Sequence, residues 1–165
     1  MGKIEAALAR LGGKRVYIDA NIFIYFLDGN ERYLPISTAL LQAARERQFF
    51  AMTGKAVVAE VMVHPYRLGN PEIIARFKQF FAQDFLTVVD HPGDLFDAAS
   101  MYAGTRRMKL MDAFHYATAL SVGCAAIVSN DTGLVGQAGI EVIGIDDLLS
   151  CDTKSRVTVA LNLKS

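Results

Sequence analysis

The sequence predicts an α/β fold, namely a three-layer α/β/α sandwich with a mainly parallel central sheet. Short segments that are apolar throughout, as buried strands are, alternate along the chain with segments of helical periodicity. Because strand–helix–strand units are right-handed, their helices should cover both faces of such a sheet. The 165 residues are 52% hydrophobic and contain no repeat or linker, which predicts one well-packed domain over residues 1–165.

The strands are predicted from short apolar runs bounded by turn or charged residues. They are residues 15–19, 49–53, 85–89, 125–129 and 141–145, and the alternating segment 156–163 is a candidate edge strand or arm. Apolar side chains at helical spacing predict helices at residues 21–27, 34–47, 55–67, 71–81, 92–107 and 111–122, with a short one at 132–138. Pro65 should limit the helix over residues 55–67.

Composition excludes some classes and leaves others open. Lys and Arg number 17, as do Asp and Glu, so the net charge does not indicate an anionic partner. Cys124 and Cys151 form no Cys-x-x-Cys pair, and we expect both to be reduced thiols, with Cys124 in the core. Glu5 and Arg10 interrupt the apolar stretch that a signal peptide would need, and no apolar run is long enough to span a membrane. We therefore expect a cytoplasmic protein.

Four acidic residues interrupt strongly apolar segments, where an unpaired carboxylate is costly. Asp19 ends the first predicted strand and Asp131 follows the fourth. Both should therefore lie at the sheet edge where parallel α/β folds bind ligands. Glu60 is the only polar side chain in residues 56–63. Asp112 opens the predicted helix over residues 111–122, whose dipole should help to keep it ionised.

Each of these acids also has a structural interpretation. Asp112 fits a helix cap, Asp131 fits a turn in Asn-Asp-Thr-Gly, and Glu60 fits an edge-facing glutamate. Asp19 is the hardest to explain in this way, because an aspartate that ends a buried strand is a common catalytic position. Together the four favour a site for a divalent cation. Hard oxygen ligands without His or Cys clusters select Mg²⁺ or Mn²⁺, and the cation relieves repulsion among crowded carboxylates.

Four motifs of the sequence are similar, in their order and spacing, to those of the PIN domain. They are Asp19-Ala-Asn-Ile-Phe-Ile-Tyr, Ala59-Glu60-Val-Met-Val, Leu110-Met-Asp112-Ala-Phe-His-Tyr-Ala-Thr-Ala-Leu and Val128-Ser-Asn-Asp131. The resemblance extends over a core of about residues 14–149. Within the family, the chain most resembles the prokaryotic VapC-type toxins of toxin–antitoxin pairs. The resemblance assigns no role to the short extensions before and after the core.

This resemblance implies a PIN-like fold and a metal-dependent endoribonuclease. Asp19, Glu60, Asp112 and Asp131 would be its acidic cluster and metal ligands. Asn21 and Ser129 match polar positions that commonly support the cluster, with Ser129 standing where threonine is frequent. Family nucleases leave 5′-phosphate and 3′-hydroxyl ends and usually form homodimers, and a small cognate antitoxin inhibits the toxins. These properties are expectations for this chain.

Basic residues and histidines have divided interpretations. Arg106, Arg107 and Lys109 lead into Asp112, and they either grip RNA phosphates or form a solvated helix end. His115 lies one turn past Asp112, and we predict that it packs in the core rather than entering the site. The other two histidines precede prolines and should lie at the ends of elements. A paired-histidine ribonuclease mechanism therefore has no support.

Three aromatic residues just past Asp19 are candidates for a groove that receives a partner, although such residues also serve in cores; they are Tyr25, Phe26 and Tyr33. Two alternatives to a toxin stay open at this point. One is an RNA-processing or repair nuclease, and the other is a non-catalytic PIN-like RNA-binding scaffold. The intact set of four acids favours a nuclease, because a scaffold has no need of crowded carboxylates.

Overall fold

A computed structural model of the chain describes residues 2–134 and 139–149. Its centre is a five-stranded sheet in which every neighbouring pair is parallel, in the order β3-β2-β1-β4-β5. The strands are β1 (Arg15–Ile18), β2 (Phe50–Gly54), β3 (Leu86–Val89), β4 (Ala126–Ser129) and β5 (Glu141–Gly144). The predicted α/β class and its parallel sheet are confirmed.

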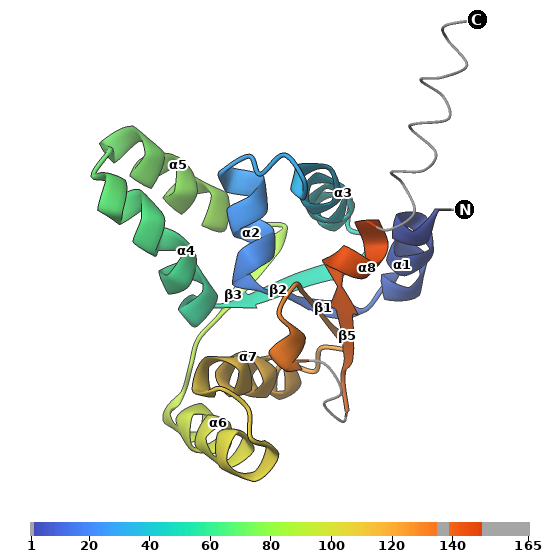
Figure 1. The fold of residues 1–165 in the computed structure, drawn as a ribbon, viewed down its shortest axis with the longest axis vertical. Coiled ribbons are helices and arrows are strands. Elements are labelled where there is room, and N and C mark those ends of the chain that lie inside the picture. The colour runs from blue at the N-terminus through green and yellow to red at the C-terminus, as the bar shows by residue number, and fades with distance from the viewer. Residues whose placement is uncertain (1, 135–138, 150–165) are drawn as a thin grey trace, which may run out of the picture.

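Helices lie on both sides of this sheet. They are α1 (Lys3–Leu11), α2 (Ala20–Leu27), α3 (Leu34–Arg45), α4 (Lys55–Leu68), α5 (Pro71–Phe81), α6 (Gly93–Arg106), α7 (Leu110–Ser121), the 3₁₀ turn η1 (Thr132–Leu134) and α8 (Ile145–Leu149). Figure 1 shows α2 and α3 on one side, and α7 with α6 beyond it on the other. Helix α2 contacts β4, while α7 contacts both β2 and β4. The arrangement is therefore the expected α/β/α sandwich.

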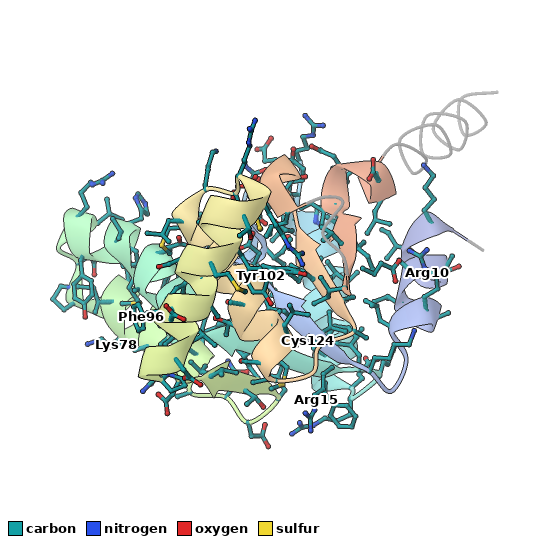
Figure 2. All side chains as sticks on the ribbon, turned by 90° about the horizontal axis from the view of Figure 1, so that it is seen from below. Arg10, Arg15, Lys78, Phe96, Tyr102 and Cys124 are labelled. Atoms are coloured by element: carbon teal, nitrogen blue, oxygen red, sulfur yellow. The ribbon has the colours of Figure 1, made fainter. Side chains whose placement is uncertain are left out.

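The apolar strands form the core. Tyr17, Ile18 and Ile127 are at most 1% exposed because β1 and β4 are covered on both faces. Cys124, which lies just before β4 and is labelled in Figure 2, is buried as predicted. Burial raises the pKa of this thiol to about 12. Within the described residues, no helix is both long and apolar enough to cross a bilayer.

Three local predictions about helices need correction. Pro65 lies inside α4, which ends at Leu68, where Gly69 takes the left-handed conformation (φ 65°) that closes the helix. Helix α1 has no counterpart in the sequence prediction, because it buries only Ala7 and Leu11 and is otherwise polar or partly exposed. Helix α8 begins at Ile145, where the sequence predicts the last residue of a strand. The candidate edge strand at residues 156–163 lies outside the described residues.

The register of β1 determines which side chains meet at the carboxyl edge of the sheet. Ile18 pairs with Val128, so the residues that follow these two strands emerge side by side. Asp19 therefore faces Ser129 across the edge. Helix α4 starts directly after β2, on the other flank of β1, and carries Glu60 towards the same edge.

Candidate metal and active site

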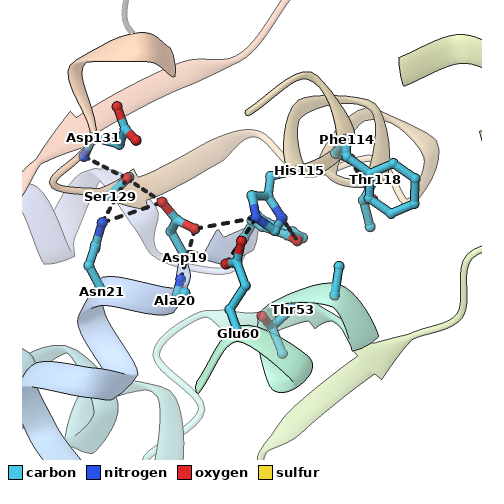
Figure 3. Close-up of polar contacts among 12 residues, drawn as sticks. Asp19, Ala20, Asn21, Thr53, Glu60, Phe114, His115, Thr118, Ser129 and Asp131 are labelled. Carbon is cyan, nitrogen blue, oxygen red and sulfur yellow. Dashed lines mark hydrogen bonds and ion pairs between the residues drawn. The ribbon is translucent and has the colours of Figure 1, made fainter. Parts of the chain in front are cut away.

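Asp19 is the most tightly held acid of the edge. It caps helix α2 and is only 6% exposed. The backbone N–H of Ala20 donates to its Oδ1 at 2.8 Å. The Ser129 hydroxyl donates to its Oδ2, and the Asn21 amide donates to the same oxygen at 3.5 Å (Figure 3). Three donors therefore fix this carboxylate in one orientation, with Asn21 and Ser129 in the supporting positions that the sequence suggested.

Ser129 and Asn21 also join the loop after β4 to Asp19. The backbone N–H of Asp131 donates to the Ser129 hydroxyl at 2.9 Å. The backbone N–H of Asn130 donates to the Asn21 side-chain oxygen at 3.2 Å. The positions of Asp19 and Asp131 are therefore coupled through one short polar network at the ends of β1 and β4.

Glu60 and His115 approach Asp19 from the other side. The His115 Nε2 atom lies 3.3 Å from Glu60 Oε2 and 4.0 Å from Asp19 Oδ1 (Figure 3). One ligand atom of each of these three residues lies within 4.8 Å of the others, which makes them a candidate metal cluster. Its mixture of two carboxylates and one imidazole differs from the all-acidic cluster that the sequence suggested.

The prediction that His115 only packs in the core is wrong. The side chain is buried, 3% exposed, but its two nitrogens face polar atoms of the site. Nδ1 hydrogen-bonds the Tyr17 hydroxyl at 3.0 Å. Burial lowers the pKa of His115, but the hydrogen bond to Glu60 and the charge of Asp19 outweigh it and raise the pKa above its usual value. The three-residue spacing from Asp112, which puts both on one side of α7, was the available signal.

Asp112 and Asp131 form the second half of the site, beside Gly133. A Cβ atom added at Gly133 would collide with the Asp112 carboxylate and lie 3.2 Å from Asp131 Oδ1. Asp112 is 7% exposed, and its Oδ2 has no hydrogen-bond partner among the described residues. Burial, followed by the charge of Asp131, raises the pKa of Asp112, while Lys109 opposes this. The expected favourable effect of the helix dipole is therefore outweighed.

Asp131 combines its two sequence interpretations. Its Oδ1 accepts the backbone N–H of Gly133 at 2.8 Å, which is a turn contact. The same side chain is half-buried, and its charge raises the pKa of Asp112. Figure 3 shows Asp131 beside Ser129. A turn role and a site role are compatible in this geometry.

The donor atoms fit a hard divalent cation. Carboxylate oxygens dominate the edge, and a buried oxygen of Asp112 lacks the partner that such an atom normally has. An unpaired buried oxygen beside a second carboxylate is destabilising unless a cation compensates it. Asp19, Glu60, Asp112 and Asp131 are therefore suited to hold Mg²⁺ or Mn²⁺, with the ligand atom of His115 adjacent.

The predicted basic residues occupy three different environments. Arg106 donates to the Tyr116 hydroxyl at 2.7 Å and stacks over the Tyr102 ring at 4.9 Å. Arg107 is exposed and ends α6 in the left-handed conformation, with φ 55°. Lys109 precedes α7, and its charge lowers the pKa of Asp112.

The predicted aromatic groove is divided. Tyr25 and Tyr33 stack with their ring centres 4.2 Å apart, and the Tyr33 hydroxyl donates to Asp146 at 2.9 Å. Phe26 instead packs against Phe80. It lines a pocket of about 350 Å³ whose walls are Phe26, Leu27, Arg76, Gln79, Phe80 and Gln83.

Comparison with known proteins identifies the fold. No curated protein matches the chain. Among solved structures, a toxin–antitoxin complex from Klebsiella pneumoniae aligns with a TM-score of 0.60 at 18% identity, over 78% of this chain and 95% of that one. The sarcin–ricin loop cleaving toxin VapC20 from Mycobacterium tuberculosis aligns with a TM-score of 0.62 at 13% identity, covering 76% and 95%. VapBC2 from Rickettsia felis, bound to a promoter DNA fragment, gives 0.60 at 12% identity, covering 79% and 98%.

A family model described as "PIN domain" matches residues 16–139. This range runs from the first strand to the turn after Asp131, and it contains every acid of the site. The match covers most of the chain and agrees with the parallel sheet and the acidic carboxyl edge. The chain belongs to the PIN domain family.

Proposed function

We propose that this chain is a metal-dependent endoribonuclease and the toxin of a toxin–antitoxin pair. The observation that carries the proposal is the buried Asp112 oxygen without a partner among the described residues, which stands beside Asp131 at the edge that also holds Asp19. A protein that used this edge only as a scaffold would be stabilised by pairing or removing that carboxylate. Membership of the PIN family and the likeness to toxin structures support the assignment as a nuclease.

Four acids would hold the metal in this proposal: Asp19, Glu60, Asp112 and Asp131. When bound, Mg²⁺ or Mn²⁺ supplies Lewis-acid chemistry for phosphodiester hydrolysis. Ser129 and Asn21 keep the Asp19 carboxylate in one orientation, because each donates a hydrogen bond to its Oδ2. The burial of Asp112 keeps water away from its oxygen and so strengthens its interaction with a cation.

Cleavage assays test the nuclease proposal directly. Pure protein is incubated with assorted RNAs in Mg²⁺, in Mn²⁺ and in chelator. We expect metal-dependent cleavage that falls by roughly a hundredfold or more when any of the four acids is changed to its amide. Asp97→Asn is the matched control, because Asp97 is an exposed carboxylate on α6. Undiminished turnover in Asp112→Asn would remove this residue from the mechanism, and binding without cleavage would favour the scaffold.

Basic residues near Asp112 are proposed to contact the RNA backbone. They are Arg106, Arg107 and Lys109, of which Lys109 acts electrostatically on Asp112. Changing each to Ala should reduce the slope of log affinity against log salt by about one unit for every phosphate interaction that the variant removes. Arg10→Ala, which removes a cation of α1 that pairs with Glu141, should leave the slope unchanged. An unchanged slope in all three site variants would assign them to a solvated helix end.

The partner proposed for the toxin is a small antitoxin that covers the acidic edge in the cytoplasm. The likeness to the Klebsiella toxin–antitoxin complex and to VapBC2 supports this partner. We further propose a homodimer as the active form, which sedimentation of the pure protein would test. Partners of this kind lay a short amphipathic segment along an apolar groove. Of the three aromatic candidates, Phe26 lines such a pocket, whereas Tyr25 and Tyr33 form a separate stacked pair.

Growth assays separate the toxin from an RNA-processing or repair nuclease. The chain is expressed alone, with Asp112→Asn, and with the product of the neighbouring small reading frame. A toxin should arrest growth only in the first case. If expression alone is harmless while the pure protein still cuts RNA, the processing or repair nuclease becomes the better assignment.

A further inference from the structure

Glu60 is held by fewer contacts than Asp19. Its side chain is 36% exposed on α4, whereas Asp19 is nearly buried and receives three hydrogen bonds. Among the described residues, His115 is the only hydrogen-bond or ion-pair partner of Glu60. A half-exposed glutamate has several rotamers, so something must select the one that points to Asp19.

A chain of polar contacts leads to Glu60 from the interior of the sheet. The Tyr17 hydroxyl is buried in β1, next to the backbone of Gly54. Its own hydrogen needs an acceptor, and His115 Nδ1 lies 3.0 Å away. A neutral imidazole that accepts at Nδ1 carries its hydrogen on Nε2. His115 Nε2 in turn lies 3.3 Å from Glu60 Oε2, a contact that a dashed line marks in Figure 3, so Glu60 is the nearest carboxylate for this hydrogen.

We infer that Tyr17 and His115 form a relay that positions Glu60 for the metal, and that His115 is not itself a metal ligand. The inference rests on the proposed metal-dependent function. If His115 ligated through Nε2, its hydrogen would move to Nδ1 and face the Tyr17 oxygen. The buried Tyr17 hydroxyl would then lose its acceptor, which is unfavourable. A protonated ring also keeps a hydrogen on Nε2, so that state too leaves no lone pair for a metal.

His115 is therefore a positioning residue that acts through Glu60. Partners that orient a metal ligand typically change metal affinity by about 10–100-fold when they are removed. The relay also links β1, α4 and α7, so its loss should loosen Glu60 without displacing Asp19, which has its own donors. If His115 were instead a direct metal ligand, a side chain that only donates a hydrogen bond to Glu60 would not restore metal affinity.

The tautomer of His115 provides the first test and is read in the unaltered protein. ¹⁵N-detected imidazole spectra of the full chain are recorded at alkaline pH, without metal and with saturating Mg²⁺. The His115 signal is identified by its loss in His115→Gln. We expect hydrogen on Nε2 in both spectra. Hydrogen on Nδ1 in the Mg²⁺ spectrum would overturn the inference.

Metal titrations provide the second test. Mn²⁺ affinity is measured by calorimetry for Tyr17→Phe, His115→Leu and His115→Gln. We expect Tyr17→Phe and His115→Leu to bind about tenfold more weakly or worse, and His115→Gln to recover part of this loss because its amide donates to Glu60. Tyr116→Phe is the matched control, because it also removes the hydroxyl of a buried tyrosine, one that lies on α7 rather than β1. This variant should bind Mn²⁺ as the wild type does.

The outcomes separate this inference from the proposed function. Wild-type affinity in both Tyr17→Phe and His115→Leu would refute the relay while leaving the nuclease intact. If the wild type binds Mn²⁺ but cuts no RNA, the nuclease fails and the relay is still judged by the tautomer and the affinities. If Tyr17→Phe does not fold, the wild-type spectra and His115→Gln still decide.

Discussion

At the scale of single residues, Asp112 shows how a functional site conflicts with stability. Its carboxyl group is nearly buried, has one oxygen without a partner among the described residues, and stands beside the negative charge of Asp131. Burial and this neighbour raise the pKa of Asp112, which means that the folded state disfavours the ionised form. The conflict lasts until a cation is present.

Replacing Asp112 with Asn should therefore stabilise the metal-free protein near neutral pH. A carboxyl group whose pKa is raised by folding contributes stability below its usual pKa and loses it as pH rises through the folded-state value. The advantage of Asp112→Asn should be present at about pH 7 and vanish below about pH 4. Thermal melts in chelator measure this, with Asp97→Asn as control. A variant that melts well below the wild type at neutral pH would identify Asp112 as structural.

Gly133 should matter for the metal and little for the fold. A Cβ atom at this position would displace the Asp112 carboxylate, which is the movable end of a side chain. Gly133→Ala should therefore reduce the rise in melting temperature that Mg²⁺ produces, with less effect on the metal-free melting temperature. Gly104→Ala is the matched control, because nothing lies within 4 Å of its added Cβ. An unaltered Mg²⁺ response in Gly133→Ala would contradict the arrangement of the acids.

Sequence reasoning placed these residues better than it described their contacts. Asp19 and Asp131 follow apolar strands, so their location at the sheet edge was predictable from the alternation of strands and helices. His115 was misjudged because a histidine within an apolar helix has the same pattern whether it packs or binds. Glu60 on α4 contacts the Nε2 atom of His115 on α7 only in the folded protein, and the sequence pattern does not reveal this contact.

At the scale of elements, the prediction succeeded where the local chemistry is strong. Helix α5 was predicted with its observed bounds because Asn70 and Pro71 mark its start and its phenylalanines fall on one face. Helix α4 continues past Pro65 because tertiary packing outweighs one missing hydrogen bond near a helix end. The backbone N–H of Ala56, at the start of α4, donates to His91 after β3. That contact between distant segments is invisible to local patterns.

Removing the cap of α5 should cost a modest and measurable stability. The Asn70 side chain accepts the backbone N–H groups of Glu72 and Ile73. Asn70→Ala should lower the free energy of unfolding by about 1 kcal/mol, and Asn70→Asp should retain most of it. Chemical denaturation gives both values. Equal stability of Asn70→Ala and the wild type would mean that water replaces the cap without loss.

At the scale of the whole molecule, the parallel sheet brings residues from four separate segments to one edge. Asp19, Glu60, Asp112 and Asp131 are far apart in the chain, and the strand order β3-β2-β1-β4-β5 makes β1 central between its partners. No single sequence motif predicts this strand order. The fold class was predictable from alternation alone, whereas the pairing of Ile18 with Val128 depends on packing of the complete core.

Cys124 offers a probe of this global packing. The thiol is buried beside β4, and burial raises its pKa to about 12, so it is neither accessible nor ionised in the native state. In a Cys151→Ser variant, a thiol reagent should react only as fast as the fold opens. Added Mg²⁺ should slow the reaction by stabilising the folded state. Rapid labelling without denaturant would show that β4 opens independently of the rest.

The pairing of β1 with β4 also has a consequence for the order of events during synthesis. Asp19 leaves the ribosome early, but its partner Ser129 and the acids at 112 and 131 follow only after about a hundred further residues have been translated. A nascent chain that stops before β4 has no complete acidic edge. A nascent chain therefore cannot carry the proposed activity before translation has passed residue 131, and a fragment that terminates before this point lacks at least one of the four acids.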